Sequence, residues 1–402
     1  MQPADIRNAR LYLTGLAASL IGNSAMSLVA GIWVKSLTGS SAQAGLVSAC
    51  IYAPSLAGPI AGLIADRVDR RRWLIAINLA AAAVILSLLT VHSAHETWVV
   101  YVAMTGYGIE LVFSDPAETA MFTELLPPAL RIRINGWRLS IQEAGRLVAP
   151  LLGAGLFALV GGGAVASLDA ATFVIAAATT VRLRMGPAEP VAGAPQRSGW
   201  RRELIAGAAH IRATPVLASV FLAAAAVMAI SGVGVAAQYS LVAALHERPA
   251  FLGVLSGALG ASSILASITA ARAIAALGER RLALTGLTAF VVGESLQAVG
   301  TIPTAIAGRL VLGFALPWVF LAVLNLTQRL TPLELQGRVA AAVTFALFGP
   351  GAPMQALGSW LISQTGFREV YLGSAIATAI VAAWLARAGR PGAQLAGSVS
   401  PE

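Results

Sequence analysis

Long apolar stretches, separated by short polar or Pro/Gly-containing breaks, run along almost the whole chain. A helix needs about 20 apolar residues to cross the hydrocarbon core of a bilayer. The pattern therefore predicts twelve membrane-spanning helices, at approximately 11–34, 42–65, 73–91, 97–121, 136–160, 164–183, 215–241, 250–272, 282–300, 304–328, 337–362 and 370–388. An even number of spans puts both termini on the same side of the membrane.

The composition agrees with this interpretation. Of the 402 residues, 57% are hydrophobic and only 11% are charged, and the mean hydropathy is +0.77. A soluble domain carries about 25% charged residues, so a soluble enzyme and a disordered protein are excluded. The single cysteine, Cys50, cannot form an intrachain disulfide. The four histidines form no metal-ligand cluster and no phosphate-binding glycine loop is present, so we expect no metal, no cofactor and no use of ATP.

The basic residues define an orientation. With the N-terminus in the cytoplasm, 22 of the 27 Lys and Arg residues fall in cytoplasmic loops, tails or helix ends, three fall outside and two lie within spans. Cytoplasmic loops of membrane proteins carry such an excess. The net charge of +9 therefore reflects topology rather than nucleic-acid binding. We expect a multi-pass, monomeric protein of a prokaryotic inner membrane, with both termini in the cytoplasm.

The longest hydrophilic stretch divides the spans into six and six. We expect an all-α membrane protein with an N-terminal six-helix bundle (1–183), a cytoplasmic linker (184–212) that includes an amphipathic helix at 200–211, a C-terminal six-helix bundle (213–388) and a cytoplasmic tail (389–402). The halves echo each other: LPPALRIRINGWR before span five corresponds to TPLELQGRVAA before span eleven, and DRVDRRR after span two to GERR after span eight. Parallel repeats of this kind occur in secondary transporters.

Two motifs sharpen this picture. The stretch from Gly62 through Asp66, Arg67, Asp69, Arg70 and Arg71 resembles the loop 2–3 signature of the major facilitator superfamily, with Asp69 where the general pattern has Gly. Span five resembles the antiporter motif of that superfamily at Gly136, Gly145, Ala149, Pro150 and Gly153. The D-R-x-D-R-R form and the segments 37–49 and 167–173 resemble the branch of macrolide and enterobactin-type siderophore exporters. This resemblance implies the major facilitator fold and proton antiport.

The resemblance also implies roles for both motifs. Asp66 would lock the two halves at the inner face and release them during switching, since an aspartate at a helix C-terminus needs nearby cations to offset the helix dipole. For the arginines, ordinary inner-side topology is the alternative. Gly145, Ala149 and Gly153 form a small-residue stripe that allows close helix approach, and Pro150 would kink the helix. Ordinary helix packing is the alternative here.

Ionisable residues inside a bilayer are costly and mark function by default. Residues equidistant from the turn of a helical hairpin lie at similar depth, which suggests three pairs: Glu110 with Arg146, Glu118 with Arg138, and Glu294 with Arg309. Glu110 and Arg146 form the deepest pair of spans four and five and are the candidates for proton coupling, together with Asp115 and Glu118. A permanent structural ion pair is an equally strong alternative.

The resemblance implies a central cavity between the bundles, lined by the first and fourth helices of each half and their symmetry mates. Candidate substrate-binding residues are Asn23, Met26, Tyr107, Gln142, Gln238, Tyr239, Phe314, Trp318 and Asn325. For any one of them, packing in the bundle core is the simpler interpretation. As a set of apolar, aromatic and amide side chains they suit an amphipathic organic molecule.

The sequence therefore predicts a secondary transporter that exports a drug-like, macrolide-like or siderophore-like compound in exchange for protons. Its partners would be this small molecule, protons and lipid. An uptake symporter of the same fold is the nearest alternative. A non-transporting membrane scaffold or an intramembrane enzyme is the alternative of another class, and the lack of a catalytic constellation disfavours the enzyme.

Overall fold

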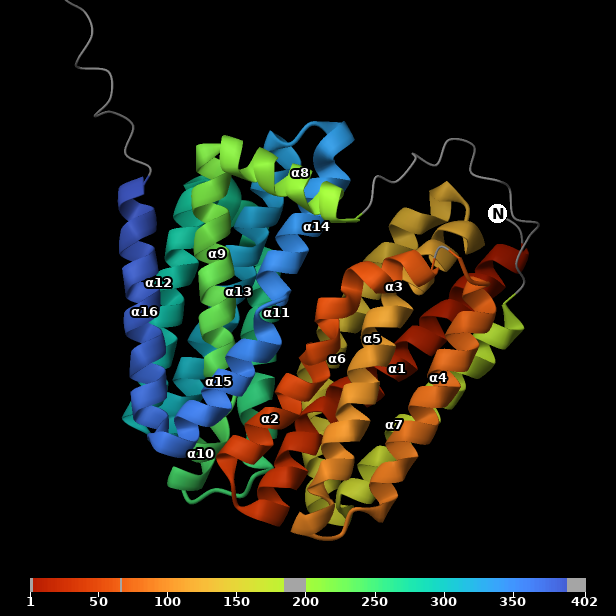
Figure 1. Cartoon of the computed structure of the whole chain (residues 1–402), viewed down its shortest axis with the longest axis horizontal. Coiled ribbons are helices and arrows are strands. Elements are labelled where there is room, and N and C mark those ends of the chain that lie inside the picture. The colour runs from red at the N-terminus through yellow and green to blue at the C-terminus, as the bar shows by residue number, and fades with distance from the viewer. Residues whose placement is uncertain (1–2, 66, 184–199, 389–402) are drawn as a thin grey trace, which may run out of the picture.

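Helices joined by short turns make up the chain (Figure 1). The computed structural model describes residues 3–65, 67–183 and 200–388. The first half contains α1 (Pro3–Thr38), α2 (Ser41–Tyr52), α3 (Gly58–Ala65), α4 (Arg70–Leu86), α5 (Thr97–Leu125), α6 (Pro128–Val160) and α7 (Gly162–Arg182), with short 3-10 helices η1 (Ala53–Ala57), η2 (Ser87–Thr90) and η3 (Ala94–Glu96). The described residues contain no β-strand, and the predicted all-α class is confirmed.

The second half begins with a helix outside the bundle. Its elements are α8 (Trp200–Ala213), α9 (Pro215–Val233), α10 (Ala237–Ala244), α11 (Phe251–Leu277), α12 (Glu279–Val299), α13 (Ile302–Leu330), α14 (Leu333–Phe348), α15 (Gly351–Gln364) and α16 (Phe367–Ala388). The amphipathic segment predicted at 200–211 forms α8. The rest of the predicted linker, 184–199, and the tail from residue 389 lie outside the described residues.

Eleven helices of the described chain are long and apolar enough to cross a membrane, one fewer than the sequence predicts. The missing one is the span at 42–65, which the structure divides into α2, η1 and α3. Pro54, at the start of η1, cannot donate a backbone hydrogen bond, so it interrupts the helix there. The span predicted at 215–241 is also in two pieces, because α9 ends at Val233 and α10 begins at Ala237.

The helices form two bundles that lie side by side, α1–α7 in red to yellow-green and α9–α16 in green to blue (Figure 1). Each bundle has its own apolar core, built around Trp33 and Phe173 in the first and around Leu217 and Phe290 in the second. Such cores arise because each helix buries one face against its neighbours and leaves the other to lipid.

The described contacts between the bundles join α2 to α10 and α15, and α6 to α11, and α2, α10 and α15 lie toward the lower end of Figure 1. Glycines allow this close approach. A Cβ atom on Gly45 of α2 would lie 2.5 Å from Ser359 Oγ of α15, and one on Gly31 of α1 would overlap the ring of Tyr239 of α10. A shared apolar cluster that includes Ile32 and Tyr239 covers this junction. We call it the interbundle seal.

Helix α8 lies at the opposite end of the molecule, against α14 (Figure 1). The contact is close at Gly207, where a Cβ atom would overlap the main chain of Arg338. The seal and α8 therefore mark the two ends of the molecule.

Candidate functional site

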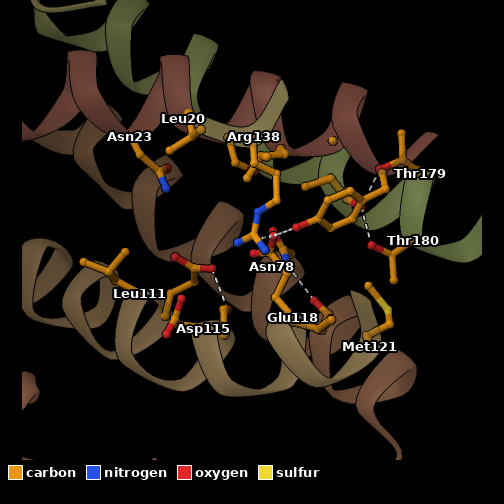
Figure 2. Close-up of a pocket in the computed structure, with 18 of the residues that line it drawn as sticks. Leu20, Asn23, Asn78, Leu111, Asp115, Glu118, Met121, Arg138, Thr179 and Thr180 are labelled. Carbon is orange, nitrogen blue, oxygen red and sulfur yellow. Dashed lines mark hydrogen bonds and ion pairs between the residues drawn. The ribbon is translucent and has the colours of Figure 1, made fainter. Parts of the chain in front are cut away.

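A polar cavity of about 170 Å³ lies inside the first bundle, between α1, α4, α5, α6 and α7 (Figure 2). Three carboxylates line it, Glu110, Asp115 and Glu118, all on α5. The remaining polar lining consists of an arginine, a phenol, amides and hydroxyls, namely Arg138, Tyr12, Asn23, Asn78, Gln142, Ser19, Ser114, Thr179 and Thr180. Polar side chains within a membrane bundle mark a water-accessible or functional path.

Glu118 holds together three helices at the wall of this cavity. The Tyr12 hydroxyl of α1 donates a hydrogen bond to Glu118 Oε1 at 2.7 Å, and Arg138 Nη2 of α6 lies 4.0 Å from the same oxygen. The Arg138 guanidinium also lies over two rings, 5.7 Å from the centroid of Tyr12 and 5.2 Å from that of Phe122. The depth match predicted for Glu118 and Arg138 is confirmed as a contact.

Glu110 lies deeper in the bundle. Its side chain is 6% exposed, and its Oε1 accepts a hydrogen bond from the Ser114 hydroxyl at 2.7 Å, one turn along α5. Asp115, by contrast, is exposed. The side chains of Arg146 and Glu143 lie outside the described ones, so the pairing of Glu110 with Arg146 stays a prediction.

The sequence interpretation missed several residues of this region. Asp169 of α7 is 1% exposed. It lies inside the predicted span 164–183, so the cost of a charge within the membrane was a sufficient signal to select it as a candidate functional residue. Tyr12 and Asn78 carried no such signal. Their position at the cavity depends on how α1 and α4 pack against α5, which no local pattern encodes.

A second polar cluster lies in the other bundle, near the interbundle seal. Arg309 Nη2 of α13 donates to Gln238 Oε1 of α10 at 2.8 Å. Glu294 of α12 is buried and lies within electrostatic range of Arg309, as the hairpin argument predicts. The guanidinium also lies within electrostatic range of Tyr371 of α16, whose buried hydroxyl has no hydrogen-bond partner among the described residues. The neighbouring residue of Gln238, Tyr239, fills the gap beside Gly31, so this cluster lies directly behind the seal.

The structure does not bring the nine candidate substrate-binding residues together. Asn23 and Gln142 line the polar cavity. Met26 and Tyr107 are buried in the core of the first bundle. In the second bundle, Phe314 and Trp318 pack edge to face with centroids 5.4 Å apart, and Trp318 Nε1 donates to Ala266 O. Asn325 is half-buried farther along the same helix. Phe314, Trp318 and Asn325 lie on one face of α13, as their spacing in the sequence predicts.

The predicted gating motif forms contacts within the first bundle, at the same end of the molecule as α8. Asp69 caps α4 by accepting the Arg72 backbone N–H at 3.0 Å. Arg70 pairs with Glu124 at the end of α5, and Arg71 donates to the Val181 carbonyl at the end of α7. Carbonyls at a helix C-terminus attract cations because of the helix dipole. Arg67 is exposed and Gly62 lies within α3, whereas Asp66 lies outside the described residues.

The second bundle repeats these contacts with the charges exchanged. Glu279 begins α12, as Arg70 begins α4, and pairs with Arg329 at the end of α13 with 3.1 Å between Oε1 and Nε. The next residue, Arg280, donates to the Leu385 carbonyl at the end of α16. The weak sequence echo between DRVDRRR and GERR therefore corresponds to equivalent positions in the two bundles.

The loops before α6 and α14 match in the same way. Arg131 donates to the carbonyls of Leu126 and Thr123, and Gln336 donates to those of Thr331 and Gln328. Each donor follows the first of its two carbonyl partners by five residues. The repeat thus preserves the turn geometry although the side chains differ.

The antiporter motif packs α6 against α1. A Cβ atom on Gly153 would lie 2.8 Å from the Ala25 Cβ, and Gly145 faces Leu20 at ordinary contact distance. Ala149 is fully buried, Pro150 lies within the continuous α6, and Gly136 faces open space. The small-residue stripe is therefore a helix-packing surface, as predicted, and Gly136 is not part of it.

This architecture of two six-helix halves with matching contacts agrees with sequence comparison. The sequence model of the Major Facilitator Superfamily matches residues 11–240 and 219–400. The chain belongs to the Major Facilitator Superfamily. It is accordingly a multi-pass membrane transporter rather than an enzyme.

Relatives of this transporter include exporters. Macrolide efflux protein A of Streptococcus pyogenes is 26% identical over 174 residues, which is 42% of this chain and 43% of that protein. The matched region thus spans less than half of that relative. An uncharacterized MFS-type transporter of Bacillus subtilis, YfiS, is 26% identical over 302 residues, 72% of this chain and 70% of that protein.

Solved transporters share the fold of this superfamily member. The nucleoside transporter NupG gives a TM-score of 0.68 at 15% identity, covering 96% of this chain and 99% of that one. A bacterial homologue of the lysosomal transporter Spinster, solved in an inward-facing and occupied conformation, gives 0.71 at 14% identity, covering 96% and 97%. At these identities the likeness concerns the fold alone.

Proposed function

We propose that this transporter exports an amphipathic organic compound, of the macrolide or siderophore class, in exchange for protons. The observation that carries the proposal is the Glu118 site, where one carboxylate at the wall of a polar cavity contacts both a phenol and a guanidinium. A carboxylate in such a position can exchange a cationic partner for a proton, because burial disfavours its charged form when the partner leaves.

The similarity to macrolide efflux protein A supports export and an amphipathic substrate. The cavity would supply both kinds of contact to such a molecule, because apolar side chains such as Leu20 and Met121 line it beside the polar ones. Glu110, Asp115 and, if it faces the cavity, Arg146 would assist Glu118 in proton exchange.

We further propose that the structure is an inward-facing conformation. The excess of basic residues supports a cytoplasmic location for the termini and α8. The interbundle seal lies at the opposite end, and would then close the outer side. In the outward-facing conformation the contacts of Arg70 with Glu124 and of Arg329 with Glu279 would instead border the closed side.

Transport into proteoliposomes tests the proposal. With an acidic lumen, an antiporter accumulates a labelled macrolide as protons leave, whereas a symporter accumulates it only when the outside is acidic. We expect accumulation with the acidic lumen. Accumulation only with the acidic exterior would establish the uptake symporter instead, and no response to either gradient would refute proton coupling.

Glu118→Gln tests the residue. This variant keeps the size of the side chain and cannot release a proton, so gradient-driven accumulation should be lost while exchange of labelled for unlabelled substrate across the membrane continues. Glu369→Gln is the matched control, since Glu369 is exposed in the first turn of α16. Unchanged accumulation in Glu118→Gln would contradict the role of Glu118.

A further inference from the structure

Asp169 is a buried carboxyl group for which the proposed mechanism has no use so far. It lies on α7, which packs against α1 and α4, and its side chain is 1% exposed. It does not line the polar cavity. A Cβ atom on Gly22 of α1 would overlap Asp169 Oδ1, so the carboxyl group lies directly against the α1 main chain.

The hydrogen bonds of Asp169 do not suit a negative charge. Asp169 Oδ2 is buried and has no hydrogen-bond partner among the described residues. Oδ1 has only the Thr172 hydroxyl, at 3.4 Å, and that hydroxyl already donates to the Asp169 main-chain carbonyl at 2.8 Å. A hydroxyl has one hydrogen but accepts others, so Thr172 can accept from Asp169 more readily than donate to it.

The surrounding charges do not compensate a carboxylate either. On α5, Tyr107 and Glu110 lie within electrostatic range of Asp169, and both would repel a negative charge if ionised. On α1, the nearest basic residues, Arg10 and Lys35, are about 18 to 20 Å along the helix from Gly22.

The other helices beside α7 are similar. The arginines of α4 stand at its start, where Arg71 contacts Val181, twelve residues from Asp169 along α7. Helix α6 carries Arg138, whose partner is Glu118, and the side chains of Glu143 and Arg146 lie outside the described ones. An isolated carboxylate in an apolar interior is strongly disfavoured relative to the neutral acid.

We infer that Asp169 holds a proton in this conformation and is a second proton-binding residue of the transport cycle, behind the polar cavity. The coupling part of this inference rests on the proposed proton exchange. Glu110 lines the cavity and lies within electrostatic range of Asp169, so it is a candidate to pass the proton between Asp169 and the cavity. The proton leaves as a solvated proton through the cavity, and the carboxylate remains.

Helix α1 supplies the link to the conformational change. Gly22 contacts Asp169, Asn23 lines the cavity with its Oδ1 unpartnered among the described residues, and Gly31 contacts Tyr239 across the interbundle seal. Gly22 and Gly31 are about 14 Å apart along one helix. When the seal opens, a movement of α1 would expose Asp169 to water on the outer side, where its carboxylate takes up a proton. After the seal closes again, the proton is released through the cavity to the cytoplasmic side, which is the direction that export in exchange for protons requires.

Infrared difference spectroscopy of the purified protein tests the proton without any transport. We expect an absorption band of a neutral carboxyl group that is lost in Asp169→Asn and persists in Glu369→Gln, whose exposed carboxylate is charged. Thr172→Val should retain the band at a shifted frequency, because the acceptor is removed, and this variant serves if Asp169→Asn does not fold. A band that is unchanged in both variants would overturn the inference.

Proteoliposomes test the coupling. Asp169→Asn should lose gradient-driven accumulation and keep exchange of labelled for unlabelled substrate, which needs no net proton movement. Accumulation equal to that of the unmodified protein would overturn the coupling role of Asp169. If the unmodified protein itself does not respond to a pH gradient, the proposed function fails and the coupling role with it, while the infrared band still decides whether Asp169 is protonated.

Discussion

The interbundle seal can be weakened by a single methyl group. In α11, a Cβ atom on Gly253 would lie 2.7 Å from the Ala154 Cβ and 3.3 Å from the Pro150 carbonyl oxygen, both on α6 of the other bundle. Ordinary contacts of a Cβ atom begin at about 3.4 Å. Neither neighbour can rotate away, because one is a Cβ and the other belongs to the main chain. Gly253→Ala therefore forces α6 and α11 apart.

The size of the effect follows from the overlap. Adding a methyl group to a tightly packed contact costs about 1 to 3 kcal/mol. Because the overlap exists only while the seal is closed, this energy shifts the equilibrium toward conformations in which the seal is open, by about 5- to 150-fold. The control is Gly155→Ala on α6, where a Cβ atom would meet open space. Both variants replace a helical glycine with alanine, so both gain about 1 kcal/mol in helix propensity and differ only in the overlap.

Distance measurements between spin labels report the equilibrium. Labels at His95, in η3, and at Arg248, in the loop after α10, occupy exposed positions of different bundles near the seal. They should show a larger fraction of long distances in Gly253→Ala than in Gly155→Ala. Cys50 is first replaced by Ser so that the labels are specific. Identical distance distributions in the two variants would refute the argument that the seal depends on glycine contacts.

Two further predictions concern the polar clusters, and thermal unfolding in detergent checks both. Tyr12→Phe removes a hydrogen bond to the carboxylate of Glu118 and should lower the free energy of unfolding by about 1.5 to 3 kcal/mol. The control is Tyr101→Phe, because the Tyr101 hydroxyl donates to the Gln43 carbonyl near the surface. An equal loss of stability in both variants would contradict the prediction. Arg309→Ala removes the hydrogen bond from the guanidinium to Gln238, leaves the buried Glu294 without a cation in electrostatic range, and should cost about 1.5 to 3 kcal/mol. Adding Glu294→Gln to that variant should recover part of the loss, and no recovery would show that the charge is not the cause.

Much of this transporter could be predicted from local patterns. Backbone polar groups in lipid must be satisfied within the segment, so a long apolar stretch has few alternatives to a spanning helix. The depth of a residue also follows from its distance to a turn, and for this reason the pairing of Glu118 with Arg138 was predictable. The break of the second span at Pro54 was not predicted, and the sequence gives no clear signal for it, since prolines also lie within the continuous helices α5, α6 and α13.

The azimuth of each helix could not be obtained in this way. Asn23 and Met26 are three positions apart on α1, yet Asn23 lines the cavity and Met26 is buried in the core. Only the packing of α1 against its neighbours separates them. The same holds for Tyr12, whose contact with Glu118 joins residues 106 positions apart in the chain.

The amino-acid sequence alone determined the spanning helices, the two-fold repeat, the orientation signal of the basic residues and the acidic residues within the membrane. These properties depend on hydropathy and spacing, which are local. Only the tertiary structure decided which acids share a cavity, that Asp169 lies against Gly22 with its Oδ2 unpartnered among the described residues, and that the bundles meet at the end that carries Gly31 and Tyr239. These depend on how helices rotate and approach one another, which is set by side-chain packing between distant segments.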